Sequence, residues 1–205
     1  MSAITEVAER HFQNGVSLLK LKGYRQALIE FQEALHHVPQ LAEAHRNIGF
    51  ILIRQGRYAE AVEAFQAGLH FRPDWPLLYS DLGRALLYLK RYDESIAALQ
   101  QAIHLKPISA DYHNLGMAYL FNKDIHGARD AYREAARLDP DDAVPRMYLG
   151  HVYSLQWQYD KAIEEYRKAL RLNPSLMRAR HGLALSFFNQ GQYLRALREW
   201  LMPRL

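Results

Sequence analysis

The chain has 205 residues and no cysteine, which excludes a disulfide scaffold, a zinc ribbon and a thiol nucleophile. Hydrophobic residues make up 49% of the sequence and charged residues 23%, a balance typical of a folded domain and not of a disordered chain. The formal net charge of +4 comes from Lys and Arg interleaved with Asp and Glu, so it favours an acidic partner only weakly and disfavours nucleic acid as a partner.

The first ten residues contain no basic start followed by an apolar core, so they do not resemble a secretory signal. No later stretch approaches the run of about 20 apolar residues that a membrane-spanning helix needs. We therefore expect a cytoplasmic protein without a membrane span.

Three series of residues recur along the chain with one period. Glycines follow steps of 34, 34, 33 and 34 residues, at Gly15, Gly49, Gly83, Gly116 and Gly150. Prolines follow the same steps, at Pro39, Pro73, Pro107, Pro140 and Pro174. Small residues do so with one further step of 34, at Ala27, Ala61, Ser95, Ala128, Ala162 and Ala196. Because the series share even the shortened step, they indicate repeated copies of one structural unit.

Each unit is predicted to form two helices and two turns. The units cover about residues 8–41, 42–75, 76–108, 109–142, 143–176 and an incomplete 177–205. In the second unit, amphipathic helices are expected over 41–54 and 59–70, with a break at 56–58 and a stop at Pro73. Further along, acidic residues 141–142 stand where a helix should begin, which suits the helix dipole.

Each unit combines small residues with one bulky residue at fixed positions. Gly49 and Ala61 are expected where the two helices of one hairpin approach closely, and Phe65 fills the adjoining space. The equivalent bulky residues are Phe31, Leu99, Tyr132, Tyr166 and Trp200. A single hairpin cannot bury such residues, so we expect neighbouring hairpins to stack around a continuous core.

This pattern resembles the tetratricopeptide-repeat family over about residues 8–201. Its fifth copy shows the small, aromatic and proline positions in full, at Gly150, Ala162, Tyr166, Ala169 and Pro174. The family's favoured tryptophan near the start of each unit is replaced by His11, His45, Tyr79, Tyr112, Arg146 and Arg180. The resemblance implies an all-α, right-handed α-solenoid of helix–turn–helix hairpins, forming a single domain over residues 1–205. It also implies a protein-interaction scaffold or adaptor whose first helices line a concave groove.

Helical geometry indicates which residues would face that groove. With Gly49 as the eighth residue of its unit, positions 4, 7, 8 and 11 form the packing stripe, and positions 2, 5, 9, 12 and 13 lie nearly opposite. From these positions, and from asparagines at position 6, we predict a peptide-binding groove comprising Phe12, Val16, Lys20, Arg46, Asn47, Phe50, Arg54, Arg84, Tyr88, His113, Asn114, Met117, Phe121, Met147 and His151. The matching ligand is a peptide or helix with apolar anchors and acidic residues.

A purely structural role stays open for several of these residues. The apolar side chains could pack between neighbouring first helices, and Arg46 could pair with Glu43, one helical turn before it. The asparagine ladder with which some family members hold a peptide backbone is interrupted here by Asp81, Tyr148 and Gly182.

Self-assembly is an alternative function. Apolar residues gather at the end of the sixth unit, namely Trp200, Leu201, Met202 and Leu205, with Pro203 where other units have Ala or Gly. They could form an exposed end that binds another copy, or simply a frayed last helix. Residues 1–7 could also insert into a neighbour's groove.

The sequence shows no pattern of a catalytic or metal site. The ten histidines lack the spacing of metal ligands, and no phosphate-binding loop or serine elbow appears. The lysine and asparagine clamp of chaperone-tail binders is also missing, because Phe12 and Val16 occupy those positions. We expect no enzyme activity, no cofactor and no metal. An RNA-binding role is a minor alternative, since positions 5 and 6 of the units carry no regular polar pair.

Overall fold

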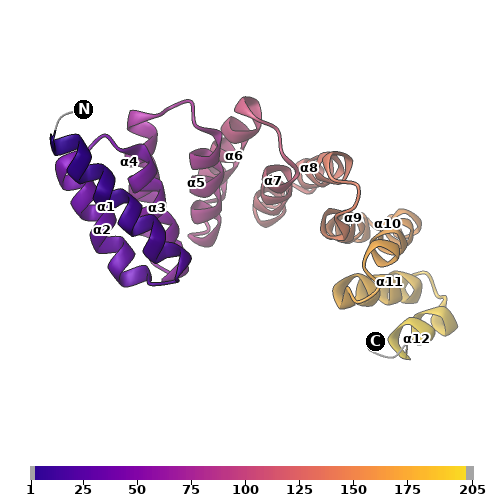
Figure 1. Ribbon diagram of the computed structural model, residues 1–205. Helices are drawn as coiled ribbons and strands as arrows, with labels where there is room; N and C mark the ends of the chain where they lie inside the picture. Colours follow the sequence, from indigo (N-terminus) through magenta and orange to yellow (C-terminus); the bar gives the residue numbers. More distant parts are fainter. Residues whose placement is uncertain (1–2, 202–205) are drawn as a thin grey trace. The chain divides into compact units, whose positions relative to one another are not determined.

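The computed structural model describes residues 3–201, and over that range the chain forms twelve α-helices and no strand (Figure 1). In chain order the helices are α1 (Ala3–Lys20), α2 (Tyr24–His37), α3 (Ala42–Arg54), α4 (Tyr58–Phe71), α5 (Pro76–Tyr88), α6 (Tyr92–Leu105), α7 (Ser109–Phe121), α8 (Ile125–Leu138), α9 (Ala143–Leu155), α10 (Tyr159–Leu172), α11 (Met177–Asn189) and α12 (Tyr193–Leu201). No helix in this range is both long and apolar enough to cross a membrane.

The chain divides into two compact units, Met1–Lys106 and Pro107–Leu205. The first unit contains α1–α6 and the second contains α7–α12. The division falls at Pro107, where the shortened step of the repeat begins. A single domain over residues 1–205 stays a prediction.

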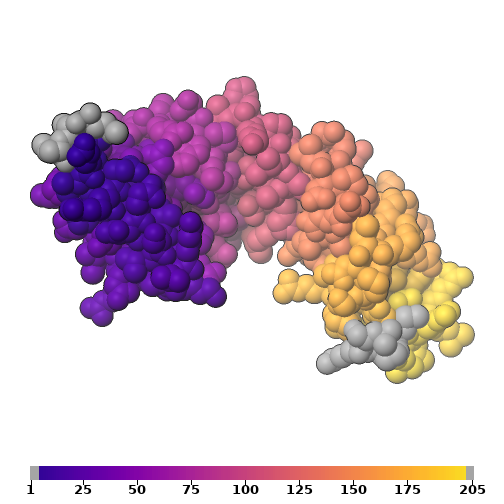
Figure 2. Space-filling model, viewed as in Figure 1, coloured from indigo at the N-terminus to yellow at the C-terminus, as the bar shows by residue number. Residues whose placement is uncertain are grey.

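Both units are built from antiparallel hairpins of consecutive helices. In the first unit α1 packs on α2, α3 on α4 and α5 on α6, and the second helix of one hairpin packs on the first helix of the next. The second unit repeats this arrangement from α7 to α12. Within each unit, side chains fill the spaces between the ribbons (Figure 2). The predicted all-α helical-repeat solenoid is thereby confirmed.

The predicted helix boundaries hold to within one residue in the second hairpin, with one correction. Tyr58, expected in the break, is instead the first residue of α4. The prediction of a helix start after residues 141–142 is correct, because the carboxylate of Asp142 caps α9 by accepting a hydrogen bond from the backbone N–H of Val144 at 2.8 Å. Residues 3–7, considered above as part of an inserting segment, belong to α1.

The small and bulky positions meet as predicted. A Cβ atom on Gly49 would lie 2.5 Å from Cε1 of Phe65, so the two helices of this hairpin can approach closely only with glycine there. Phe65 is fully buried, as is Tyr132 in the second unit. Trp200 is the exception. Its side chain is 56% exposed, because no helix of the described chain follows α12 to cover it. Met202, Pro203 and Leu205 lie outside the described residues.

The turn inside every hairpin contains one residue with a left-handed backbone. These residues follow the period of the repeat, at Lys22, Gly56, Lys90, Lys123, Trp157 and Gly191, with φ between 60° and 75°. Glycine adopts this conformation at little cost, whereas lysine and tryptophan are strained in it. The turn geometry is therefore dictated by the hairpin and not by the local residue type.

Candidate functional site

The first helices of the hairpins carry most of the residues predicted to bind a ligand. We call the surface formed in each unit by positions 2, 5, 6, 9, 12 and 13 of these helices the odd-helix face. In the first unit it belongs to α1, α3 and α5, and in the second to α7, α9 and α11.

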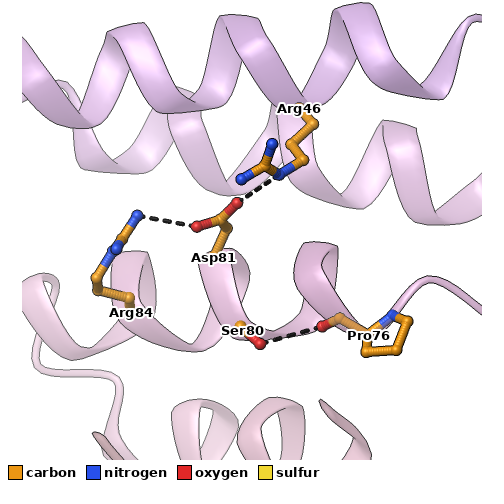
Figure 3. A network of polar contacts seen from close by, with 5 residues as sticks. All are labelled: Arg46, Pro76, Ser80, Asp81 and Arg84. Atoms are coloured by element: carbon orange, nitrogen blue, oxygen red, sulfur yellow. Dashed lines mark hydrogen bonds and ion pairs between the residues drawn. The ribbon is translucent and has the colours of Figure 1, made fainter. Parts of the chain in front are cut away.

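In the first unit, a buried carboxylate joins two of the predicted arginines (Figure 3). Asp81 of α5 is 4% exposed, and its Oδ2 accepts a hydrogen bond from Nε of Arg46 on α3 at 2.8 Å. Its Oδ1 accepts a second bond from Nη2 of Arg84 at 2.9 Å. Both arginines therefore have a partner inside the chain.

The suggested pairing of Arg46 with Glu43 is wrong. Glu43 pairs with Arg72 at the end of the neighbouring helix α4, and the guanidinium of Arg72 lies 4.2 Å from the ring centroid of Trp75. Arg46 instead reaches the next hairpin, 35 residues further along the chain. Of the three arginines predicted to line the groove, only Arg54 forms no ion pair among the described residues, and its side chain is exposed.

In the second unit, a pocket of about 340 Å³ opens between α9 and α11. Residues at positions 5, 6, 9 and 12 of α9 meet residues at positions 2, 5, 6 and 9 of α11, above a tyrosine from α10. The lining consists of Met147, Tyr148, His151, Ser154, Tyr166, Arg178, His181, Gly182 and Leu185. The positions expected from helical geometry to face a ligand therefore converge on one cavity.

The floor of this pocket is apolar and buried. Met147 is 6% exposed and Tyr166 is 3% exposed. Burial raises the pKa of Tyr166 to about 12, and a hydrogen bond with Ser154 partly opposes this rise. Tyr166 therefore stays neutral at physiological pH and offers an aromatic surface.

The rim of the pocket is exposed and carries one arginine and two histidine side chains. His151 comes from α9, whereas Arg178, His181 and Leu185 come from α11. Partial burial lowers the pKa of the His151 imidazole, so this ring is mostly neutral near pH 7. None of the lining residues, which all fall within the described range, carries a carboxylate.

The other predicted residues fall into two groups. Phe12 and Val16 pack against the core formed around Phe31, and Met117 packs against the core formed around Tyr132. The first group is partly buried and also contains Arg46, Asn47, Phe50, Arg84, His113 and Asn114. The second group is exposed and consists of Lys20, Arg54, Tyr88, Phe121 and His151.

Two aromatic contacts further reduce what is free to bind a ligand. The ring of Tyr88 stacks on Tyr58 with centroids 4.6 Å apart. His113 lies edge-on to Tyr148 at 5.2 Å. These contacts favour a structural role for Tyr88 and His113.

Arg178, His181 and Leu185 occupy positions 2, 5 and 9 of the sixth unit, so the helical geometry that selects the other groove residues also predicts that these three face the groove. The sequence gives no sign that they share one cavity with Met147, His151 and Tyr166. Over residues 3–201, no three His, Cys, Asp or Glu side chains form a group that could hold a metal ion.

The sequence matches models of a known protein family. Models described as tetratricopeptide repeat match residues 40–107 and 80–143, and one described as TPR repeat matches residues 158–191. The chain belongs to the tetratricopeptide-repeat family. Members of this family are typically non-catalytic modules that bind other proteins or peptides.

Solved tetratricopeptide-repeat structures share the fold. MamA from Desulfovibrio magneticus RS-1 is 24% identical, with a TM-score of 0.80 over 85% of this chain and 99% of that one. YrrB, described as a TPR protein with an unusual peptide-binding site, is 22% identical, with a TM-score of 0.75 over 88% and 97%. PilF from Pseudomonas aeruginosa is 20% identical, with a TM-score of 0.78 over 95% and 90%. No curated protein matches the sequence.

Proposed function

We propose that this tetratricopeptide-repeat chain is an adaptor or assembly scaffold that holds another protein through a peptide or helix docked on its odd-helix face. The pocket between α9 and α11 carries the proposal, because it combines a buried apolar floor with an exposed basic rim. Such a cavity accommodates a side-chain anchor and orients it by polar contacts. The description of YrrB as a peptide-binding tetratricopeptide-repeat protein supports the same class of ligand.

The proposed partner carries apolar anchors and acidic groups. In the first unit, Asp81 offsets one of the two arginine charges that it binds, and the exposed Arg54 adds another positive charge to the same face. In the second unit, Arg178 and two histidines surround the pocket. Both units therefore present a modestly basic surface, although Arg46 and Arg84 act partly as structural residues.

Affinity capture from a source lysate tests this proposal. Arg54→Glu combined with Arg178→Glu reverses two exposed charges on the odd-helix face, one in each unit. Arg25→Glu combined with Arg133→Glu makes the same charge change at exposed arginines of the second helices α2 and α8 and serves as the control. Arg46 and Arg84 are left unchanged, because reversing them would place like charge against Asp81.

A protein retained by the wild type and the control but lost from the face variant is the expected result, after nuclease treatment and with helical content unchanged by circular dichroism. Equal capture by all three proteins would refute binding through the odd-helix face. The absence of catalysis and the cytoplasmic location stay predictions and are not tested by this experiment.

Self-association is a second candidate function, supported by the exposed apolar face of α12. Leu194 is 84% exposed, Leu201 71% and Trp200 56%. An apolar surface of this kind is typical of contact sites. Sedimentation equilibrium of the wild type and of Leu194→Ser with Leu201→Ser tests it. A mass that rises with concentration only in the wild type is expected, whereas a monomer at all concentrations would exclude this role.

A further inference from the structure

Arg178, the cation of the α9–α11 pocket, differs from Arg46 and Arg84 of the first unit, because it has no ion-pair partner among the described residues. In the first unit, Asp81 binds two arginines and Glu43 binds another. Over residues 3–201, no carboxylate forms an ion pair with Arg178, His151 or His181. A cation on an exposed rim above a buried apolar floor is complementary to an acidic group attached to an apolar one.

The spacing along α11 sets the distance between the two parts of the ligand. Arg178 and His181 occupy the first turns of α11, and Leu185 follows one turn later on the same stripe. At 1.5 Å per residue, the midpoint of Arg178 and His181 lies about 8 Å along the axis from Leu185. In an extended peptide, residues two apart point to the same side and are separated by about 7 Å. The two spacings match.

We propose that the α9–α11 pocket binds an extended, chain-internal peptide segment in which an Asp or Glu side chain and a large apolar side chain are two residues apart. The acidic group lies against Arg178 and His181, and the apolar group enters between Met147 and Leu185 over the ring of Tyr166. This inference rests on the proposed function, since it specifies what the odd-helix face of the second unit recognises.

The size of the pocket favours a side chain as its occupant. A volume of about 340 Å³ is at the lower end of the range for small-molecule sites, which runs from roughly 300 to 1,000 Å³. The lining residues of α11 extend over about two turns in all, from Arg178 to Leu185, and Arg178, His181 and Leu185 are exposed, so we expect the peptide backbone to continue past the pocket. A chain-internal carboxylate fits this arrangement without requiring a chain terminus.

Binding of short synthetic peptides to the full-length, ¹⁵N-labelled chain tests the motif. The reference peptide contains Asp-Ser-Leu between Gly-Ser flanks, is acetylated and amidated, and is titrated while amide chemical shifts are recorded. Three further peptides carry Asn-Ser-Leu, Asp-Ser-Ser, or Asp-Ser-Leu at a free carboxyl terminus. We expect shifts at the amides of His181 and Gly182, about fivefold weaker binding of the Asn and Ser peptides, and equal binding of the peptide with the free terminus.

Variants of the protein test whether the peptide binds at the α9–α11 pocket. Arg178→Glu is expected to weaken binding of the Asp-Ser-Leu peptide about fivefold and to remove the preference for Asp over Asn, whereas Arg133→Glu, with the same charge change on α8, leaves both unchanged. Leu185→Ser changes an exposed residue, so it keeps the fold while weakening the apolar part of the contact.

Three outcomes overturn the proposal: equal binding of the Asp and Asn peptides, shifts confined to other surfaces, or tight binding of the free-terminus peptide alone. These outcomes are separable from failure of the proposed function. If lysate capture still depends on the odd-helix face while the peptides show no preference, only the motif is wrong. If lysate capture is independent of that face as well, the proposed function fails with it.

Discussion

Gly182 and Tyr166 are so close that a side chain on residue 182 is excluded. A Cβ atom built on Gly182 would lie 2.3 Å from Cζ of Tyr166 and 2.5 Å from its hydroxyl oxygen. One hairpin earlier, the same two positions hold Tyr148 and Tyr132, whose rings stack with centroids 5.2 Å apart and planes 12° from parallel. A ring covers the core tyrosine there, whereas glycine leaves Tyr166 at the floor of a pocket.

Gly182→Ala is therefore expected to deform the pocket and to destabilise the second unit. The methyl group must displace Tyr166, and such overpacking typically costs about 1–3 kcal/mol, more than the helix propensity that alanine contributes. Urea unfolding followed by circular dichroism measures the loss, and titration with the Asp-Ser-Leu peptide measures pocket function. Arg133→Ala, at an exposed position of α8 outside the odd-helix face, is the control and should change neither quantity.

Asp81→Asn is expected to destabilise the first unit by about 2 kcal/mol. Removing the carboxylate leaves Arg46 and Arg84 without their shared partner. The loss is smaller than the roughly 3–5 kcal/mol of a fully buried pair, because the side chain of Arg84 is 39% exposed. Thermal and urea unfolding of the variant provide the measurement.

The matched control is Glu94→Gln, which removes an exposed i,i+3 partner of Arg91. Such surface pairs contribute little, so the unfolding midpoint should stay at the wild-type value. Equal effects of Asp81→Asn and Glu94→Gln would show that the network drawn in Figure 3 makes no special contribution to stability.

Contacts within one repeat could be predicted from the sequence, whereas the contacts of Asp81 between hairpins could not. The hairpins, the breaks and the pairing of Gly49 with Phe65 follow from periodicity, because each depends on residues within one repeat. The bond from Arg46 to Asp81 joins residues 35 positions apart on different hairpins, so the nearer Glu43 looked like the better partner. The pocket was missed for a related reason. It requires Gly182 to leave uncovered Tyr166, a residue of the core pattern from the preceding hairpin, beside polar side chains from α9 and α11.

The six hairpin turns predict opposite effects for two reciprocal substitutions. Lys90 (φ 60°) and Gly56 (φ 75°) occupy the same turn position, and in both turns the following backbone N–H donates to the carbonyl five residues before it, Arg91 to Leu86 and Arg57 to Leu52. Lys90→Gly relieves left-handed strain and should stabilise the first unit by about 0.5–1 kcal/mol, whereas Gly56→Lys should destabilise it by a similar amount. Urea midpoints that move in the same direction for both variants would contradict this account.

His113 makes the stability of the second unit depend on pH. Burial lowers the pKa of its imidazole, and the carboxylate of Asp142 opposes this shift without cancelling it. Its Nδ1 atom has no hydrogen-bond partner among the described residues, and its ring contacts the stacked rings of Tyr132 and Tyr148, with centroids 5.7 Å and 5.2 Å away. The folded state therefore binds this proton less readily than the unfolded state, in which the pKa is about 6.5.

Stability is consequently greatest above about pH 6.5 and falls as the pH drops below that value, since the unfolded state then binds more protons. His151, whose pKa is also lowered by burial, contributes in the same direction. Thermal unfolding between pH 8 and pH 5 should show a shallower decrease for His113→Phe, because phenylalanine keeps the aromatic contacts and cannot be protonated. His104→Gln, an exposed site on α6, is the control and should retain the wild-type slope. An unchanged slope for His113→Phe would mean that its ring is hydrated equally in the folded and unfolded states.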